Sequence, residues 1–97
     1  VYISAEDKAQ ADTILNSLLN KKLVAGGLLL NAPARFWWKG KISKSKEIVS
    51  LVKTKKENWT KIKVGVKKIH PYNTPCIMKF DVEANPDYEQ WVNDETK

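Results

Sequence analysis

The sequence predicts an α+β domain of the ferredoxin-like type, an antiparallel sheet covered on one face by two helices, followed by a C-terminal helix. Short apolar runs alternate with stretches at helical spacing, in the order strand, helix, strand, strand, helix, strand and terminal helix. That order, βαββαβ, is the split ferredoxin-like arrangement. The chain has 97 residues without a linker, repeat or low-complexity tract, so we expect one domain over residues 1–97.

The first strand and the first helix are expected within the first 22 residues. Tyr2 and Ile3 open a short apolar segment that predicts a strand. Residues 4–7 (SAED) predict a helix N-cap with acidic residues in the first turn. One apolar face at helical spacing follows: Ala11, Ile14, Leu15, Leu18 and Leu19. Lys21 and Lys22 suit the end of this helix, because a helix C-terminus favours cations.

A long apolar run comes next and predicts a buried strand over residues 24–30. Gly26 and Gly27 within it indicate either a bulge or a close approach of another part of the chain. Pro33 is expected to break or bend the run, since proline lacks the amide hydrogen that a sheet requires.

Residues 34–38 continue the strand pattern, and Lys39-Gly40 is typical of a hairpin turn. The returning strand is expected to be centred on residues 48–54. Trp37 and Trp38 are neighbours on a strand and therefore point to opposite faces. We expect one of the two in the core and the other against solvent or a partner chain.

The second half of the chain predicts a helix, a strand and a short terminal helix. Helical spacing of apolar residues covers residues 58–69, and His70-Pro71 ends that helix because the residue before proline avoids helical geometry. Alternation then predicts a strand with one set of side chains in the core: Cys76, Met78, Phe80 and Val82. Asn85-Pro86 starts the last helix, whose apolar face carries Tyr88, Trp91 and Val92. We expect Trp59 and Trp91 to pack in the core.

The composition limits which cellular compartment and which partners we expect. A single cysteine cannot form an internal disulfide, which favours a reducing compartment such as the cytoplasm. No apolar run approaches the ~18 residues of a membrane span, so we expect no membrane partner. The chain begins at Val1 without methionine, which leaves room for a removed targeting segment upstream.

The net charge of +6 is unevenly distributed. Residues 35–79 contain thirteen basic and two acidic residues, whereas residues 80–97 contain one basic and six acidic residues. A basic face could attract an anion or an acidic tail in a neighbouring subunit. The chain lacks an RNA-binding aromatic motif, so we expect no specific nucleic-acid partner.

His70 and Cys76, the only histidine and the only cysteine, lie on either side of a proline-rich corner. As metal ligands they would supply one nitrogen and one sulfur, a pair suited to copper. Alternatively, His70 stabilises the end of the preceding helix, and Cys76 is a small buried thiol. No nucleophile, metal-hydrolase or phosphate-loop motif is present, so we expect a protein that is not an enzyme.

Four motifs in this order and at this spacing resemble the CutA family of divalent-cation-tolerance proteins over nearly the whole chain. They are FWWKGK (residues 36–41), Glu47 before an apolar strand that ends in Lys53-Thr54, HPYNTP (residues 70–75) and NPDYEQWV (residues 85–92). Many family members carry a cysteine where Gly26 or Gly27 stands here.

The resemblance implies a homotrimer, similar to PII signalling proteins, that is associated with copper or other divalent metals. It implies an intersubunit cleft with five side chains: Trp38, Glu47, Lys53, His70 and Tyr72. From the residues themselves, the expected metal ligands are His70 and Cys76, and Trp37 and Trp38 are expected at the trimer interface. The alternative function is a PII-like trimeric sensor whose ligand, an anion or nucleotide, is held in the cleft by Lys53 and neighbouring lysines.

Overall fold

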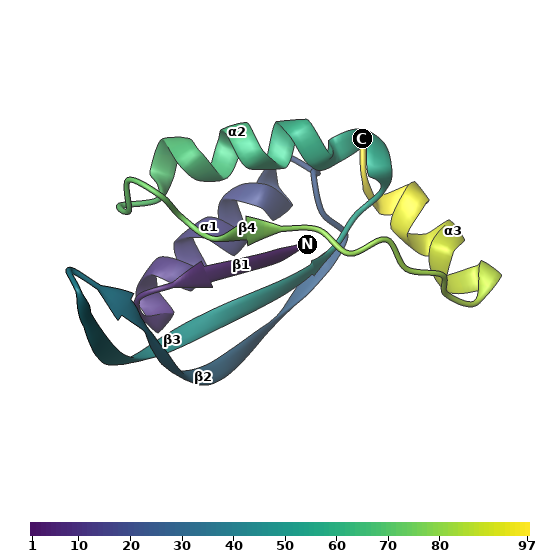
Figure 1. The fold of residues 1–97 in the computed structure, drawn as a ribbon. Coiled ribbons are helices and arrows are strands. Elements are labelled where there is room, and N and C mark those ends of the chain that lie inside the picture. Colours follow the sequence, from purple (N-terminus) through teal and green to yellow (C-terminus); the bar gives the residue numbers. More distant parts are fainter.

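In the computed structural model, which describes residues 1–97, four strands form one antiparallel sheet in the order β2-β3-β1-β4 (Figure 1). The elements in chain order are β1 (Tyr2–Ala5), α1 (Lys8–Asn20), β2 (Gly26–Trp38), β3 (Lys41–Lys53), α2 (Trp59–Ile69), β4 (Ile77–Met78) and α3 (Pro86–Glu95). A 3-10 turn, Lys56–Asn58, precedes α2. The predicted α+β class and the order βαββαβ with a terminal helix are confirmed.

Helices α1 and α2 cover one face of the sheet, and the hydrophobic core lies between these two layers (Figure 1). The core residues are Ile3, Ala5, Ala11, Ile14, Leu18, Leu23, Val24, Val52, Ile62 and Val66. Full burial of one valine, leucine or isoleucine side chain contributes about 1.5–3 kcal/mol to the stability of the fold. Leu19, predicted on the same helix face, is exposed, so the buried stripe of α1 is narrower than the sequence pattern.

No helix packs on the other face of the sheet (Figure 1). The register places Leu28 opposite Leu51, Leu51 opposite Tyr2, and Tyr2 opposite Met78, so one row of side chains crosses all four strands. Leu28 is 51% exposed and Met78 is 43% exposed. Leu30 lies two residues along β2 from Leu28 and points to the same side. We call Tyr2, Leu28, Leu30, Leu51 and Met78 the open face.

Strands β2 and β3 form a long hairpin whose tip extends past the helices (Figure 1). The predicted turn at Lys39-Gly40 is confirmed, and both residues have positive φ, 50° and 76°, as a two-residue hairpin turn requires. Trp37 and Trp38 lie beside the turn and are 73% and 61% exposed. The prediction that one of them lies in the core is wrong, because no helix covers the tip.

The hairpin is longer than predicted, and Pro33 does not break it. Pro33 pairs with Lys46 in an uninterrupted register, and β3 begins at Lys41, well before the predicted centre of the strand at residues 48–54. Because β2 is an edge strand, one side of it needs no ladder hydrogen bonds, and proline is tolerated there. The same register contains no bulge at Gly27, which leaves the alternative of a close approach.

The predicted start of the first helix, with its N-cap at Ser4, is three residues too early. Ser4 and Ala5 belong to β1, where pairing with β3 keeps the backbone extended. The N-cap is Asp7, whose carboxylate accepts a hydrogen bond from the Gln10 amide at 2.9 Å. The first turn, which starts at Lys8, carries no acidic residue.

The predicted face of the last strand is reversed. The residues expected in the core are exposed: Cys76, Met78, Phe80 and Val82. Ile77 instead pairs with Ile3 and packs against the core. The alternation of residues along a strand shows that its two faces differ, but it does not show which face is buried. Here both faces of the sheet carry apolar residues, so the apolar set did not identify the core side. The strand is also short, since only Ile77 and Met78 pair with β1.

Helix α3 lies at one end of the molecule, beside the base of the hairpin (Figure 1). Val92 is buried, and the Lys97 amide donates a hydrogen bond to the Lys22 carbonyl at 2.9 Å. Trp91 is 43% exposed and Trp59 is half-buried, so neither fills the core as expected. No helix of the chain combines the length and the apolar character that crossing a bilayer requires.

Candidate functional site

The corner HPYNTP begins where α2 ends, and His70 fixes that end to β1. The His70 amide donates to the Val66 carbonyl at 2.8 Å, which completes the last turn. His70 is 7% exposed, with Nε2 2.7 Å from the Ser4 carbonyl oxygen and Nδ1 3.2 Å from the Tyr72 amide nitrogen. The Tyr72 amide can only donate, so Nδ1 accepts and Nε2 carries the proton that is donated to Ser4.

Both ring nitrogens of His70 are therefore occupied by backbone groups. A metal ion at either nitrogen would have to replace one of these buried hydrogen bonds, which costs free energy. This geometry favours the structural alternative for His70. The metal-ligand alternative stays a prediction.

Tyr72 lies beside His70 and extends the corner towards the sheet. The two rings are 4.6 Å apart between centroids and inclined by 55°. Burial raises the pKa of the Tyr72 hydroxyl, and neighbouring carboxylates raise it further. One of those carboxylates belongs to Glu47, which places two of the predicted cleft residues near each other.

Cys76 and Glu47 lie on the same side of the sheet, the side without helices, close enough for the charge of Glu47 to act on the thiol. Burial raises the pKa of the Cys76 thiol, and the negative charge of Glu47 raises it further. The Ser4 amide donates to the Cys76 carbonyl at 3.2 Å, which anchors the start of β4 to β1. Tyr2 lies in the same surroundings as Cys76 and Glu47, since burial, Cys76 and Glu47 together raise the pKa of its hydroxyl.

Tyr2 was not among the residues predicted for the site. It becomes a neighbour of Cys76 only through the pairing of β1 with β4, which joins residues more than seventy positions apart. The alternation in the first strand, with Ile3 and Ala5 buried, places Tyr2 on the opposite face. That was the available signal.

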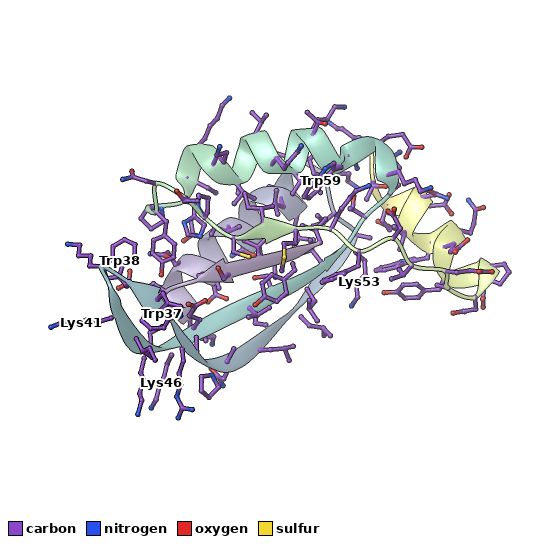
Figure 2. All side chains as sticks on the ribbon, viewed as in Figure 1. Trp37, Trp38, Lys41, Lys46, Lys53 and Trp59 are labelled. Carbon is purple, nitrogen blue, oxygen red and sulfur yellow. The ribbon has the colours of Figure 1, made fainter.

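Trp38 and Lys53 are not brought together within the chain. Trp38 pairs with Lys41 at the tip of the hairpin, and Lys53 pairs with Gly26 at its base (Figure 2). The twelve residues from Lys41 to Lys53 span about 40 Å of strand. A cleft that contains both Trp38 and Lys53 therefore requires two chains.

Lys53 lines a small hollow of about 160 Å³ at the base of the hairpin. Lys56 and Lys79 also line it, together with the aromatic rings of Trp59 and Phe80. Lys79 is paired with Asp81 at 3.5 Å, whereas no carboxylate is paired with Lys53 or Lys56. The hollow therefore offers cationic groups beside aromatic surface.

The Cys76 and Glu47 pair is limited as a metal centre within one chain. No group of three or more His, Cys, Asp or Glu side chains lies close enough to hold a metal ion. Stable metal sites in proteins usually have four or more ligands, of which a thiolate and a carboxylate are only two. Further ligands would have to come from a second chain.

The proximity of Glu47 and Cys76 predicts a pH effect on thiol reactivity. A raised pKa means that less thiolate is present at a given pH. Glu47→Gln removes one cause of the rise, so the midpoint of the pH–rate profile for alkylation by iodoacetamide should move to lower pH. Glu57→Gln, at the other end of α2, is the matched control and should leave the midpoint in place. Equal midpoints in all three proteins would contradict the proximity.

The fold and these side chains define a class of protein. The chain is a small ferredoxin-like domain with an apolar sheet face that no helix covers, and Tyr2, Glu47 and Cys76 lie on that face. The family model for the CutA1 divalent ion tolerance protein matches residues 1–95. The chain belongs to the CutA1 family, and the resemblance drawn from the motifs is confirmed.

The similarity extends over whole chains. The divalent-cation tolerance protein CutA of Pyrococcus horikoshii is 37% identical over 98 residues, which covers 100% of this chain and 96% of that protein. The crystal structure of CutA1 from the same organism superposes with a TM-score of 0.95 at 35% identity, covering 99% of this chain and 95% of the other. The CutA structure from Archaeoglobus fulgidus, described as periplasmic, gives a TM-score of 0.95 at 33% identity, with the same coverage.

Proposed function

We propose that this protein is a homotrimeric divalent-cation-tolerance protein that binds metal ions between its subunits. The observation that carries the proposal is the family match over residues 1–95, because the matching relatives are named for divalent-cation tolerance. The open face supports assembly, since a contiguous apolar surface of this kind marks a contact with another protein. Trp37 and Trp38 at the exposed hairpin tip are proposed to reach the neighbouring subunit.

The proposed metal donors are Cys76 and Glu47, completed by residues of a neighbouring subunit. The free thiol of Cys76 favours copper, and other divalent ions are proposed to bind more weakly. His70 is proposed to support this site indirectly, because its ring holds the corner that ends at Cys76. We propose a binding protein rather than an enzyme, located in the cytoplasm where the thiol stays reduced.

The hollow around Lys53 favours a second candidate function. A trimeric sensor of the PII-like kind would hold an anion or nucleotide there, with the lysines on the phosphates and Trp59 against a planar ring. This alternative differs from the first in its ligand and in the residues that hold it. One set of titrations separates the two.

The test is sedimentation followed by calorimetric titration of the same protein with Cu²⁺, Zn²⁺ and ATP. We expect a trimer that binds copper weakly, at about micromolar dissociation constants, and more tightly than it binds ATP. Cys76→Ser and Glu47→Gln should weaken copper binding. His70→Ala should lower the melting temperature and leave copper affinity nearly unchanged.

Two results would contradict the metal proposal. One is copper affinity that is unaffected by Cys76→Ser and Glu47→Gln. The other is ATP binding that is tighter than copper binding and is lost in Lys53→Gln, which would establish the alternative. A monomer at micromolar concentration would remove the intersubunit site from both functions.

A further inference from the structure

The outer half of the hairpin carries only positive charge. Residues 31–46 contain five basic residues and no acidic one: Arg35, Lys39, Lys41, Lys44 and Lys46. The two ion pairs of the chain, Lys22 with Glu95 and Lys79 with Asp81, lie elsewhere. These five charges are therefore not neutralised by any carboxylate of the same chain.

The strand register concentrates three of these charges on one face. Arg35 lies directly opposite Lys44, and Lys46 is two residues further along the same strand. Residues that are directly opposite or two apart point to the same side of the sheet. Like charges directly opposite in an antiparallel pair destabilise it, so an anion bound between Arg35 and Lys44 would remove a repulsion that the folded chain otherwise retains.

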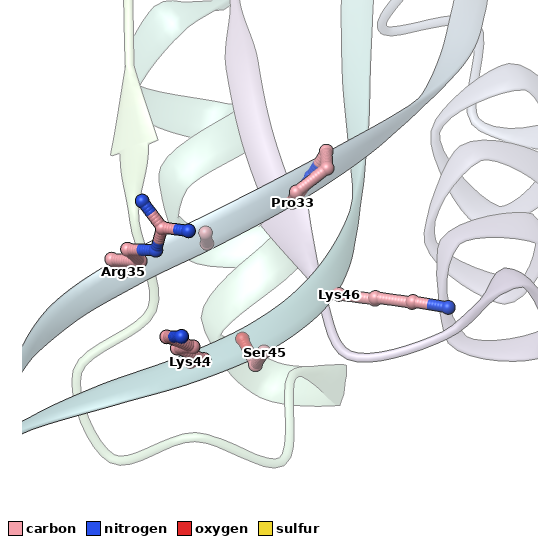
Figure 3. Close-up of a pocket in the computed structure, with 6 residues that line it drawn as sticks. Pro33, Arg35, Lys44, Ser45 and Lys46 are labelled. Atoms are coloured by element: carbon pink, nitrogen blue, oxygen red, sulfur yellow. The ribbon is translucent and has the colours of Figure 1, made fainter.

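The same residues line a hollow of about 670 Å³ (Figure 3). Its lining is Pro33, Ala34, Arg35, Lys44, Ser45 and Lys46. Arg35 extends from β2 and Lys44 from β3, while the ammonium group of Lys46 points away from both (Figure 3). The hollow is wide and open, with room for a polyatomic anion.

We propose that this hollow binds a phosphate-bearing anion with at least two negative charges, such as a diphosphate group. A guanidinium donates two parallel hydrogen bonds to adjacent phosphate oxygens, and an ammonium group adds a compact positive charge. Arg35 and Lys44 place two cations on neighbouring strands. This pair fits an anion with two neighbouring phosphates better than it fits an anion with a single charged group. The diphosphate could be free in solution or part of a nucleotide, and both present the same group to Arg35 and Lys44.

This site is separate from the sites named above. Arg35, Lys44 and Lys46 share the side of the sheet on which Ile48 and Ala5 lie, because these residues alternate along the paired strands. The open face is on the opposite side, so contacts made by the open face itself do not cover these charges. Of the residues proposed to reach a neighbouring subunit, only Trp37 shares their side. The inference goes beyond the metal proposal and does not depend on it.

The test is calorimetric titration with pyrophosphate and with ADP at constant ionic strength. Arg35→Gln combined with Lys44→Gln should weaken pyrophosphate binding at least tenfold. The matched control, Lys61→Gln combined with Lys67→Gln on α2, removes the same charge and should change affinity less than twofold. If ADP and pyrophosphate bind equally and both depend on the hairpin pair, the phosphates alone are bound. Tighter ADP binding with the same dependence identifies a nucleotide as the source.

Several outcomes would overturn the proposal. Equal weakening in the hairpin and control pairs would show an effect of net charge alone. Loss of binding in Lys53→Gln, with binding retained in the hairpin pair, would assign the anion to the smaller hollow. Citrate that binds as tightly as pyrophosphate would refute the phosphate class, and no detectable pyrophosphate binding at millimolar concentration would refute the site.

A second measurement uses stability and a reversed charge. Lys44→Glu turns the repulsive pair with Arg35 into an attractive one, so this variant should melt at a higher temperature than the parent when no anion is present. Pyrophosphate should raise the melting temperature of the parent but not that of Lys44→Glu. A parent whose melting temperature does not respond to pyrophosphate would count against the site.

Discussion

Gly27→Val is expected to lower the free energy of unfolding by about 3 kcal/mol or more, a typical upper cost of overpacking a core. A Cβ atom at Gly27 would lie 2.9 Å from Cδ1 of Leu15 and 3.0 Å from Cγ1 of Val52. Both distances are below normal carbon–carbon contact. Leu15 can move its flexible end, but Val52 is buried and branched at Cβ, so its position is fixed by the core.

The measurement is equilibrium unfolding in denaturant, with a matched glycine as the control. Gly65 lies in α2, and a Cβ atom there meets nothing within 4 Å. Gly65→Ala should therefore stabilise the protein by about 0.5–1 kcal/mol, because alanine restricts the unfolded chain and favours the helix. A loss of stability in Gly27→Val and a gain in Gly65→Ala would separate the effect of close packing from the effect of backbone entropy. A Gly27→Val variant as stable as the parent would contradict the close approach.

Most elements could be predicted because their signals are local. The apolar face of α1 and the two-residue turn at Lys39-Gly40 depend on residues within one or two turns of the chain. The face of β4 could not be predicted in the same way. Ile77 is buried because it pairs with Ile3, a contact between distant parts of the sequence, while an apolar residue such as Met78 remains on the open face.

The candidate site was predictable only in part, for the same physical reason. The corner after α2 follows from His70-Pro71, and the structure adds that the imidazole is held by Ser4 and Tyr72. Sequence proximity to Cys76 suggested a His–Cys metal pair. The neighbour that perturbs the Cys76 pKa is instead Glu47, which comes from another strand of the sheet.

The open face provides the second large prediction. Leu28→Lys is expected to convert the proposed trimer, of three times 11.1 kDa, into monomers at micromolar concentration. Each buried leucine contributes about 1.5–3 kcal/mol, and a lysine in its place would have to be desolvated without a partner. Because three subunits carry the substitution, the penalty is applied at every interface of the trimer.

The control for this prediction is a position of equal exposure on the opposite side of the subunit. Val64 on α2 is 50% exposed, against 51% for Leu28, so Val64→Lys changes charge and apolar area in a comparable way. Sedimentation should report a trimer for the parent and for Val64→Lys, and a folded monomer for Leu28→Lys. Circular dichroism should be the same for all three, since Leu28 is outside the core that α1 and α2 cover. If Leu28→Lys remains trimeric on dilution to submicromolar protein, the subunits assemble through another surface, and the proposed metal donors on this side of the sheet lose their second chain.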